Sequence, residues 1–504
     1  MKKEKLLENI VYEENHTTIA NLPEECLIEI FKFLPIADRA RIERVSKTWQ
    51  ILAKQSWHKV KEFNIDPKFL GLKPFGIRHK YKVLYESNFR EILKRCGNYL
   101  IKIDLSSYRY SVCLLSAVAE YCYNIQSIKC YRPSETGILK LAKNCTHISE
   151  FICSEIRQSC EDAVAALFSV NKNFQTLKIF SEYLTGNCLL NLPLEEMISI
   201  DVNGKILKAF NIFKKTKKLS VFKSKFKGEN LIKNLAIHCS NLTILKLYYY
   251  TESGDDIVNN LDFMLSKLFK NNQNLKSLDL ENFYNFTGEC LLSLNKNKIE
   301  EICLSNIDKI HGIYFVNSLP YFVKLHKIYL CSIGIFGDCD KSIRDSISLC
   351  SNLKELTVMV IQNYLYDDFK ESIISLKNIE SLKFYMNQSL LNNSLFPSIG
   401  CTLLKLKYLD IKCCTDLTDN DLDCISNLSN LEELNISSNG NVTGSTLVKF
   451  SKLKKLHCSY CNSLESDNLI SFMRCAINLE FLNVSDCMKI ETSAINAAIE
   501  ITKK

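Results

Sequence analysis

Apolar residues recur along most of this chain in one six-residue pattern, L-x-x-L-x-L. In the clearest copy the apolar positions are Leu406, Leu409 and Ile411, and Cys414 and Leu417 follow them. This alternation predicts a short β-strand with apolar side chains on one face and the intervening residues on the other. Because one copy cannot bury its apolar face alone, the repeated copies predict a stack in which each unit packs on its neighbours.

The pattern runs from about residue 100 to the C-terminus, and its spacing of about 25 residues is the period of leucine-rich repeats. The frame is weak between Phe174 and Leu242, where two copies fit with openings near Leu194 and Leu219. The first apolar residues of the copies are Leu100, Ile125, Ile148, Phe174, Leu194, Leu219, Leu242, Leu275, Ile299, Leu325, Leu353, Ile379, Leu406, Leu431, Leu453 and Leu479. The predicted fold class is therefore α/β, a curved solenoid of about 16 repeats with a parallel sheet on the concave face and helices on the convex face.

A second pattern, with helical spacing, precedes the repeats. Leu27, Ile30, Phe31 and Leu34 fall on one stripe of a helix that Asn21 can cap, with Pro23 in its first turn. Pro35 ends this helix, Asp38 is expected to cap a second helix that turns Ile42 and Val45 inward, and Ser46 is expected to start a third that carries Trp49. Three helices in about 40 residues bury little surface, so this unit is expected to lean on a partner.

These N-terminal residues resemble an F-box, whose pattern begins L-P-x-E-x-L-x-x-I-F-x-x-L. Two positions depart from it, Arg39 where an apolar residue is common and Ser46 where Cys is common. The matching residues are Leu22, Pro23, Glu25, Leu27, Ile30, Phe31, Leu34, Asp38, Val45, Trp49 and Trp57. The resemblance implies docking on the Skp adaptor of Skp–cullin–F-box ubiquitin ligases through Leu22, Pro23, Leu27, Ile30, Phe31, Leu34, Val45 and Trp49. The alternative is a plain helical unit that caps the solenoid.

The chain is predicted to divide into a mobile N-terminus (1–17), the F-box (18–66), a connector (67–98) and the solenoid (99–504). In the connector, Asn88 to Glu91 looks like a capping box, and Gly97 is expected to stop a helix that covers the first repeat. At the other end, the last apolar positions, Ile495, Ala498 and Ile499, suit the helix of the final repeat.

The 23 cysteines fit the repeat. Cys414, Cys461 and Cys487 take its Asn/Cys position, and Cys458 takes the third strand position, which suits a small buried residue. Their odd count, with no apolar signal-peptide core near the N-terminus, indicates free thiols in a reducing compartment, hence cytoplasm or nucleus. No apolar run reaches membrane-spanning length and no lipidation motif is present.

The net charge of +8 comes from one segment, since Lys205 to Lys227 holds nine lysines and no acid and the remainder sums to −1. Lys214 to Lys218 fits a nuclear import signal or a contact to an acidic partner, and the alternative is a solvated lysine-rich face. A general nucleic-acid binder would spread positive charge more widely and use Arg as well.

No catalytic or cofactor motif stands out, and Cys458 and Cys461 are explained by the repeat rather than by a metal. The candidates for partner contact are aromatic residues at outward strand positions, Tyr248, Tyr329, Tyr385, Tyr408 and Phe481. Chance placement in a Tyr- and Phe-rich chain is the alternative for each of them. The unit that opens at Leu242 also carries a polar insert from Thr251 to Asn260, a length irregularity typical of binding loops.

The chain as a whole resembles F-box and leucine-rich-repeat proteins of the cysteine-containing subclass, as in the stretch from Cys414 to Asp419. The resemblance implies a non-catalytic substrate receptor that needs no cofactor and raises the local concentration of a protein near the ubiquitin-conjugating machinery. The rival interpretations are a scaffold that promotes no degradation and a binder of RNA or an acidic surface through Lys205–Lys227. Loss of binding with salt would support the second.

Overall fold

The computed structural model describes residues 19, 22–65, 86–107, 114–181, 183–192, 199–203, 216–224, 228–249, 260–335, 339–359, 366–385, 395–414 and 416–502. They fall into two compact units, Met1–Phe174 and Gln175–Lys504, and each is treated by itself. The predicted mobile N-terminus (1–17), the early connector (67–85) and most of the polar insert after Tyr250 lie outside the described residues.

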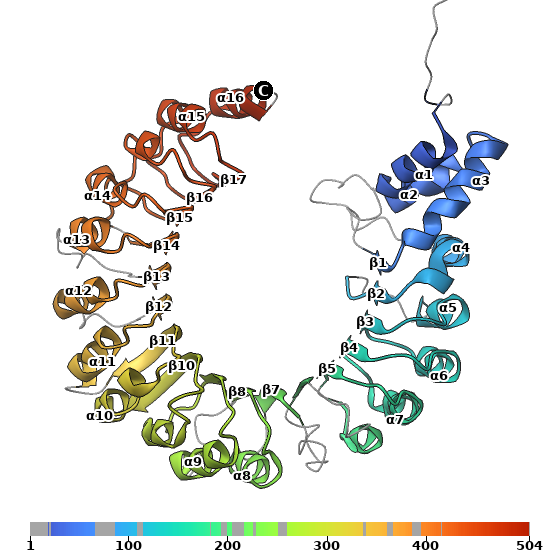
Figure 1. Cartoon of the computed structure of the whole chain (residues 1–504), viewed down its shortest axis with the longest axis horizontal. Coiled ribbons are helices and arrows are strands. Elements are labelled where there is room, and N and C mark those ends of the chain that lie inside the picture. Colours follow the sequence, from blue (N-terminus) through green and yellow to red (C-terminus); the bar gives the residue numbers. More distant parts are fainter. Residues whose placement is uncertain are drawn as a thin grey trace, which may run out of the picture. The chain divides into compact units, whose positions relative to one another are not determined.

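The first unit begins with three helices, and four parallel strands with further helices follow (Figure 1). The helices are α1 (Glu24–Phe33), α2 (Ile36–Ile42), α3 (Lys47–Ser56), α4 (Glu86–Cys96), α5 (Leu114–Tyr121), α6 (Glu135–Asn144) and α7 (Glu161–Val170). The strands are β1 (Glu62–Asn64), β2 (Lys102–Asp104), β3 (Ser127–Tyr131) and β4 (Glu150–Ser154), each parallel to the next. Strand β1 was not predicted, and it extends the sheet one strand ahead of the first repeat.

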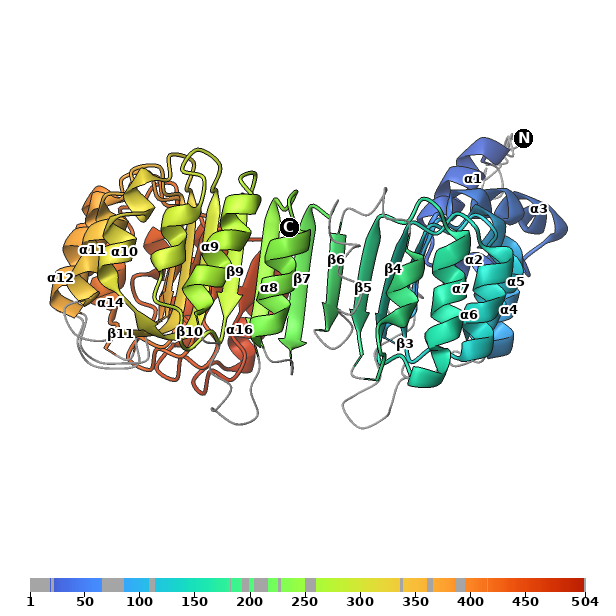
Figure 2. The ribbon, with the colours of Figure 1, turned by 90° about the horizontal axis from the view of Figure 1, so that it is seen from below.

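The second unit continues the same alternation of strand and helix. Its strands are β5 (Thr176–Phe180), β6 (Ser199–Asn203), β7 (Lys218–Ser224), β8 (Ile244–Tyr249), β9 (Ser277–Glu281), β10 (Glu301–Ile310), β11 (Lys327–Ile335), β12 (Glu355–Met359), β13 (Ser381–Tyr385), β14 (Tyr408–Asp410), β15 (Glu433–Asn435), β16 (Lys455–His457) and β17 (Phe481–Asn483). Its helices are α8 (Gly228–His238), α9 (Leu261–Asn271), α10 (Gly312–Val316), α11 (Cys339–Ser348), α12 (Tyr366–Ser375), α13 (Leu395–Thr402), α14 (Asp419–Ile425), α15 (Ser466–Cys475) and α16 (Thr492–Thr502). Successive strands pair in parallel, and the helices lie side by side on one face of the sheet (Figure 2). We call the other face of the strands the open face.

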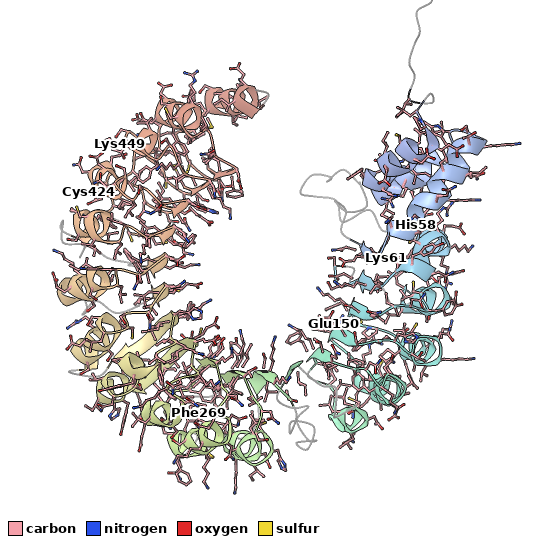
Figure 3. The ribbon with its side chains drawn as sticks, viewed as in Figure 1. His58, Lys61, Glu150, Phe269, Cys424 and Lys449 are labelled. Carbon is pink, nitrogen blue, oxygen red and sulfur yellow. The ribbon has the colours of Figure 1, made fainter. Side chains whose placement is uncertain are left out.

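The core of each repeat lies between its strand and its helix, as the alternation predicts. Leu406, Leu409 and Ile411 are fully buried there. On the helix side, Phe269 of α9 fills the same layer (Figure 3). The predicted α/β solenoid of leucine-rich repeats is confirmed within each unit.

The Asn/Cys position ties neighbouring repeats together. The Asn439 side-chain amide donates to the carbonyl oxygens of Ile411 (3.0 Å) and Ile436 (2.7 Å), and the Cys461 thiol donates to the same Ile436 oxygen at 3.2 Å. These small buried donors satisfy carbonyl groups at the ends of the short strands, which would otherwise be buried without a partner.

One of the two copies in the weak part of the frame opens three residues earlier than predicted. Ile200 pairs with Leu219, and Leu219 pairs with Leu245, so Leu219 occupies the second apolar position and not the first. The copy therefore opens at Thr216, which is fully buried. Leu194, the other predicted opening, lies outside the described residues. A polar residue at a core position explains why the apolar pattern was hard to follow.

The last repeat ends in a helix, as predicted, and Ile495, Ala498 and Ile499 lie in it. Ala494 and Ala497 are the buried positions of this helix, α16, while Ile495 and Ile499 are about half exposed.

Candidate functional site

The F-box folds around a small apolar core. Leu27 and Phe31 of α1 pack with Leu52 and Ala53 of α3, and all four are buried. Ser46 caps α3 by accepting a hydrogen bond from the Trp49 amide at 3.1 Å, as predicted. Asp38 does not cap α2, because that helix begins at Ile36 after Pro35 and Asp38 lies within it, paired with Arg41.

The predicted single stripe of α1 is two stripes on different faces. Leu27 and Phe31 point into the core, whereas Ile30 is 37% exposed and Phe33 is 86% exposed. Pro23, Cys26, Ile30 and Phe33 are all exposed and are spaced three or four residues apart, so they share one side of the helix. We call these four residues the outer stripe. Sequence reasoning missed Cys26 and Phe33, although their spacing from Ile30 was a usable signal.

The structure sorts the eight predicted adaptor contacts by exposure. Leu22, Pro23, Ile30 and Val45 are exposed. Leu27 and Phe31 are buried, and Leu34 and Trp49 pack against them, with the Trp49 ring 5.1 Å from that of Phe31. The buried pair cannot touch a partner directly in this conformation and instead supports the helices that present the other residues. Val45 is 62% exposed, which corrects the expectation that it points inward.

Arg39 explains how the F-box tolerates a cation at a usually apolar position. Its guanidinium is buried and donates to the carbonyl oxygens of Lys32 (2.6 Å) and Leu34 (3.2 Å) at the end of α1, and to that of Ser56 (3.3 Å) at the end of α3. The same group lies 5.6 Å from the centre of the Trp57 ring. Helix C-termini carry partial negative charge, so the buried cation holds two of them together. Burial lowers the pKa of Arg39.

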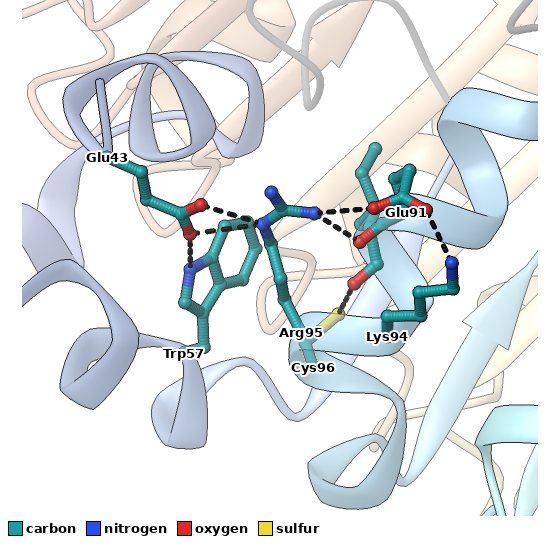
Figure 4. A network of polar contacts seen from close by, with 7 residues as sticks. Glu43, Trp57, Glu91, Lys94, Arg95 and Cys96 are labelled. Carbon is teal, nitrogen blue, oxygen red and sulfur yellow. Dashed lines mark hydrogen bonds and ion pairs between the residues drawn. The ribbon is translucent and has the colours of Figure 1, made fainter. Parts of the chain in front are cut away.

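A second polar network attaches the F-box to the helix before the first repeat (Figure 4). The buried Glu43 carboxylate accepts from Trp57 Nε1 at 2.8 Å and from Arg95 Nε at 2.9 Å. Arg95 belongs to α4 and also donates to the Glu91 carbonyl oxygen at 2.6 Å. Glu91 is thus a partner of Arg95 and Lys94 inside α4, which begins at Glu86, and the predicted capping box from Asn88 is wrong. Gly97 follows the last residue of α4, as predicted.

Backbone and apolar contacts strengthen this attachment. Strand β1 pairs with β2 through Phe63 and Ile103, and the Phe63 ring meets that of Phe89 edge-on at 5.7 Å. The F-box therefore continues directly into the repeat sheet of the first unit. Its outer stripe is held by several independent contacts rather than by a loose linker.

The open face of the second unit carries the predicted aromatic residues, but it does not gather them. Tyr248, Tyr329, Tyr408 and Phe481 stand on β8, β11, β14 and β17, three strands apart each time. That separation is about 14 Å between successive members. Tyr385 lies at the end of β13, and its side chain is outside the described part of the structure. These residues form a row of separate contact points and not one pocket.

Most of these aromatic side chains already have partners in the protein. The Tyr248 hydroxyl donates to Asp279 Oδ2 at 2.7 Å, and burial followed by this hydrogen bond raises the pKa of Tyr248. Burial raises the pKa of Tyr329 to about 12. The Tyr408 hydroxyl donates to Asp410 at 3.2 Å, and the Phe481 ring lies 4.8 Å from that of His457. Lys383 Nζ also lies 4.6 Å from the centre of the Tyr408 ring, so this ring has a partner on one of its faces as well.

Charges at the start of the strands largely neutralise one another. Glu380 accepts from Lys407 at 2.6 Å and lies 3.3 Å from Lys354, and hydrogen bonds from these lysines lower its pKa. The pairs Lys276–Glu300 (2.8 Å) and Lys454–Glu432 (2.8 Å) repeat the arrangement. These described lysines and glutamates are therefore paired with one another, and exposed pairs of this kind add little stability.

The cysteines are free and mostly buried in the described residues. Burial raises the pKa of Cys458 well above its usual range and that of Cys461 to about 11.

No group of three or more potential ligand side chains is placed to hold a metal ion in the part of the chain that is described. None of the described helices combines the length and apolarity needed to cross a bilayer. Of the basic segment Lys205–Lys227, residues 205–215 and 225–227 lie outside the described residues.

Comparison with known proteins agrees with the two parts of the fold. An F-box-like family model matches residues 19–62. Human F-box/LRR-repeat protein 12 is 26% identical over 150 residues, covering 30% of this chain and 43% of that protein, and the bovine protein is 29% identical over 111 residues, covering 22% and 32%. A putative RNA-binding protein of Caenorhabditis elegans is 20% identical over 449 residues, covering 87% of this chain and 52% of the relative.

The matched segments span about half or less of these relatives. Among solved structures, the yeast Rad7 and Elc1 complex contains a chain that aligns with a TM-score of 0.37 and 14% identity, covering 83% of this chain and 89% of that one. The F-box-like match at residues 19–62 and the repeat geometry give this chain an F-box-like unit followed by leucine-rich repeats, and part of it is similar to F-box/LRR-repeat proteins.

Proposed function

We propose that this protein is the non-catalytic substrate-recognition subunit of a Skp–cullin–F-box ubiquitin ligase. Its F-box docks on the Skp adaptor, and through it on a cullin, while the repeats bind the protein to be ubiquitinated. The contribution to the reaction is proximity, because the complex holds a substrate lysine near the conjugating enzyme. The free cysteines of the described residues support a reducing location, in the cytoplasm or the nucleus.

The observation that carries the proposal is the outer stripe of α1. Ile30 and Phe33 are exposed although α1 has a separate apolar face for its own core. An exposed apolar patch on a small unit is typical of a protein–protein interface. Leu22 and Val45, also exposed, extend the candidate surface. The Glu43–Arg95 and β1–β2 contacts would then fix the first repeats relative to the adaptor, which is what a receptor needs for a defined substrate position.

Co-elution of the full-length protein with the Skp adaptor tests the proposal. Ile30→Asp together with Phe33→Asp places two charges on the outer stripe without entering the core, so we expect binding to fall by at least about a hundredfold. Leu139→Asp in α6 is the matched control, because Leu139 is an exposed apolar helix residue outside the F-box. Its adaptor binding should equal that of the wild type.

The two tryptophans of the chain, Trp49 and Trp57, both lie in the F-box, so tryptophan fluorescence shows whether a variant keeps that unit folded. A folded Ile30→Asp/Phe33→Asp variant that still binds the adaptor would rule out the outer stripe as the docking surface. If the wild-type protein does not bind the Skp adaptor, the scaffold interpretation is favoured instead.

For the substrate, we propose the ring faces of Tyr329, Tyr408 and Phe481 on the open face, together with Tyr248 and Tyr385. Tyr248, Tyr329, Tyr408 and Phe481 are three strands apart. This spacing favours a partner that contacts the open face at several points over one that inserts a single side chain. Tyr329→Ser with Tyr408→Ser should stabilise a ubiquitinated substrate in cells while leaving adaptor co-elution unchanged. Equal substrate turnover in the variant and the wild type would exclude these two residues from recognition.

A further inference from the structure

A groove of about 630 Å³ lies between α8 and α9 of the second unit. It is on the helix-covered side of the sheet, so it is separate from the open face and from the candidate substrate residues there. Nothing in the repeat fold requires it, because both helices already bury their inner faces through residues such as Leu235 and Leu268.

Two large apolar side chains border this groove and are unusually exposed. Ile237 of α8 is 64% exposed, and Phe263 of α9 is 62% exposed. Between them, Ala236 and Met264 also line the groove and are buried. A small residue and a flexible thioether make a floor that adapts to an inserted side chain.

The spacing of the two exposed residues matches a helix. Leu245 pairs with Leu278, so equivalent positions of these two repeats differ by 33 residues and Ile237 is level with Lys270 of α9. Ile237 and Phe263 are therefore separated by seven helical positions, or about 10 Å along the groove. Residues i and i+7 of a third helix, on one of its faces, are separated by the same distance.

The charged side chains that line the groove are all positive. Lys233, Lys267 and Lys270 line it, and no carboxylate does among the described residues. Lys267 Nζ lies 4.7 Å from the centre of the Phe263 ring, so a cation sits beside the apolar anchor. The open-face lysines are different, because Lys354 and Lys407 have a paired glutamate.

We propose that the groove between α8 and α9 binds an acidic amphipathic helix of a partner protein. Apolar residues at i and i+7 of that helix contact Phe263 and Ile237, next to the buried Met264 and Ala236. Its flanking Asp and Glu side chains pair with the three lysines, and this complementary charge orients the helix and speeds its association. The exposed apolar residues favour a peptide over a nucleic acid, which would use charge without them.

This inference does not depend on the proposed ligase function. The groove and the F-box belong to different units, and the groove lies on the opposite side of the sheet from the open face. A failure of adaptor binding would leave the groove prediction standing, and the reverse also holds.

A displayed library of helix-forming peptides, with varied apolar and charged positions, tests the proposal on the full-length protein. We expect the selected peptides to carry apolar residues at i, i+3 or i+4, and i+7 with an excess of Asp and Glu, and their binding to weaken as salt rises. Ile237→Ser/Phe263→Ser, and separately Lys233→Glu/Lys267→Glu/Lys270→Glu, should each weaken the best peptide at least about tenfold. Because all five residues are at the surface, the thermal transition of each variant should match the wild type.

Leu349→Ser with Leu404→Ser is the matched control, since both residues are exposed leucines of the same unit outside the groove. Its peptide binding should be unchanged. The proposal is overturned if no peptide is selected, if the selected peptides lack the acidic excess, or if the groove variants bind them like the wild type. It is also overturned if a single-stranded RNA oligonucleotide or phosphatidylserine vesicles bind the wild type more tightly than the peptide and lose that binding in the lysine variant.

Discussion

At the residue scale, the buried Glu43 carboxylate is the polar group on which the F-box attachment depends. Its two partners are Trp57 Nε1 within the F-box and Arg95 on α4. Burying a charged residue is costly even when it is paired, and a buried charge that loses its partner is strongly destabilising. The stability of the F-box is therefore coupled to a residue outside it.

We predict that Arg95→Met destabilises the F-box by about 2 kcal/mol, because it removes a charge-assisted hydrogen bond from a buried carboxylate. Lys94→Met is the control, since Lys94 pairs with Glu91 at the exposed surface of the same helix. Urea unfolding followed by the fluorescence of Trp49 and Trp57 measures both variants. Equal urea midpoints for the Arg95→Met and Lys94→Met variants would show that the stability of the F-box does not depend on the contact between Glu43 and Arg95.

The cysteines allow a second residue-scale prediction. Burial raises the pKa of Cys461 to about 11 and that of Cys458 well above its usual range, so neither forms the reactive thiolate near neutral pH. Cys26, Cys401 and Cys475 are exposed. At pH 8 a maleimide should label these three quickly, and the buried thiols should react only in denaturant. Mass spectrometry of the labelled peptides checks this, and rapid native labelling of Cys461 would contradict its burial.

At the element scale, one glycine sets the distance between two helices. A Cβ on Gly400 of α13 would collide with the carbonyl oxygen of Cys424 in α14, which is backbone and cannot move independently. We predict that Gly400→Ala destabilises this part of the second unit by about 2 kcal/mol, as overpacking does. Hydrogen exchange of peptides from α13 and α14 should become faster.

Gly440→Ala is the matched control, because a Cβ there meets no atom within 4 Å. Replacing glycine where the backbone tolerates alanine stabilises slightly or has no effect, by about 0.5 kcal/mol at most. If both glycine variants exchanged like the wild type, the close approach of α13 to α14 would have to be relaxed in solution.

The elements also show what the sequence could predict. The strands could be predicted from L-x-x-L-x-L because buried residues such as Leu409 and Ile411 alternate with residues of the open face. The frame failed at Thr216, where a buried polar residue takes an apolar position. Helix starts at Asp38 and Asn88 were misplaced because each residue has a charged or polar side chain suited to a cap but sits inside a helix whose start is set by packing.

The F-box surface was predicted only in part for a related reason. Ile30 and Phe31 are adjacent, and both matched the F-box pattern, but only tertiary packing decides which one the core takes. Phe33 has no place in that pattern and is nevertheless the most exposed of the apolar residues on α1. Patterns of residue type identify the family and the core well, while the docking face depends on how α1 rotates against α3.

At the scale of the whole molecule, each repeat contacts only its neighbours, so stability should be local. Ile302 is fully buried in β10 and pairs with Leu278 of β9 and Ile328 of β11. Ile302→Ala removes apolar volume from that core at a cost of about 3 kcal/mol. We predict faster hydrogen exchange in peptides from β9 to β11, with unchanged F-box fluorescence and unchanged co-elution with the Skp adaptor.

Leu52→Ala provides the reciprocal experiment, because Leu52 lies in the F-box core. This variant should lose adaptor binding and the tryptophan fluorescence of the folded F-box. Hydrogen exchange in peptides from β9 to β11 should remain as in the wild type. A uniform rise in exchange across both units in either variant would indicate one cooperative structure instead of a stack. Local stability would suit the proposed receptor function, because residues of the open face could then change without destabilising the F-box.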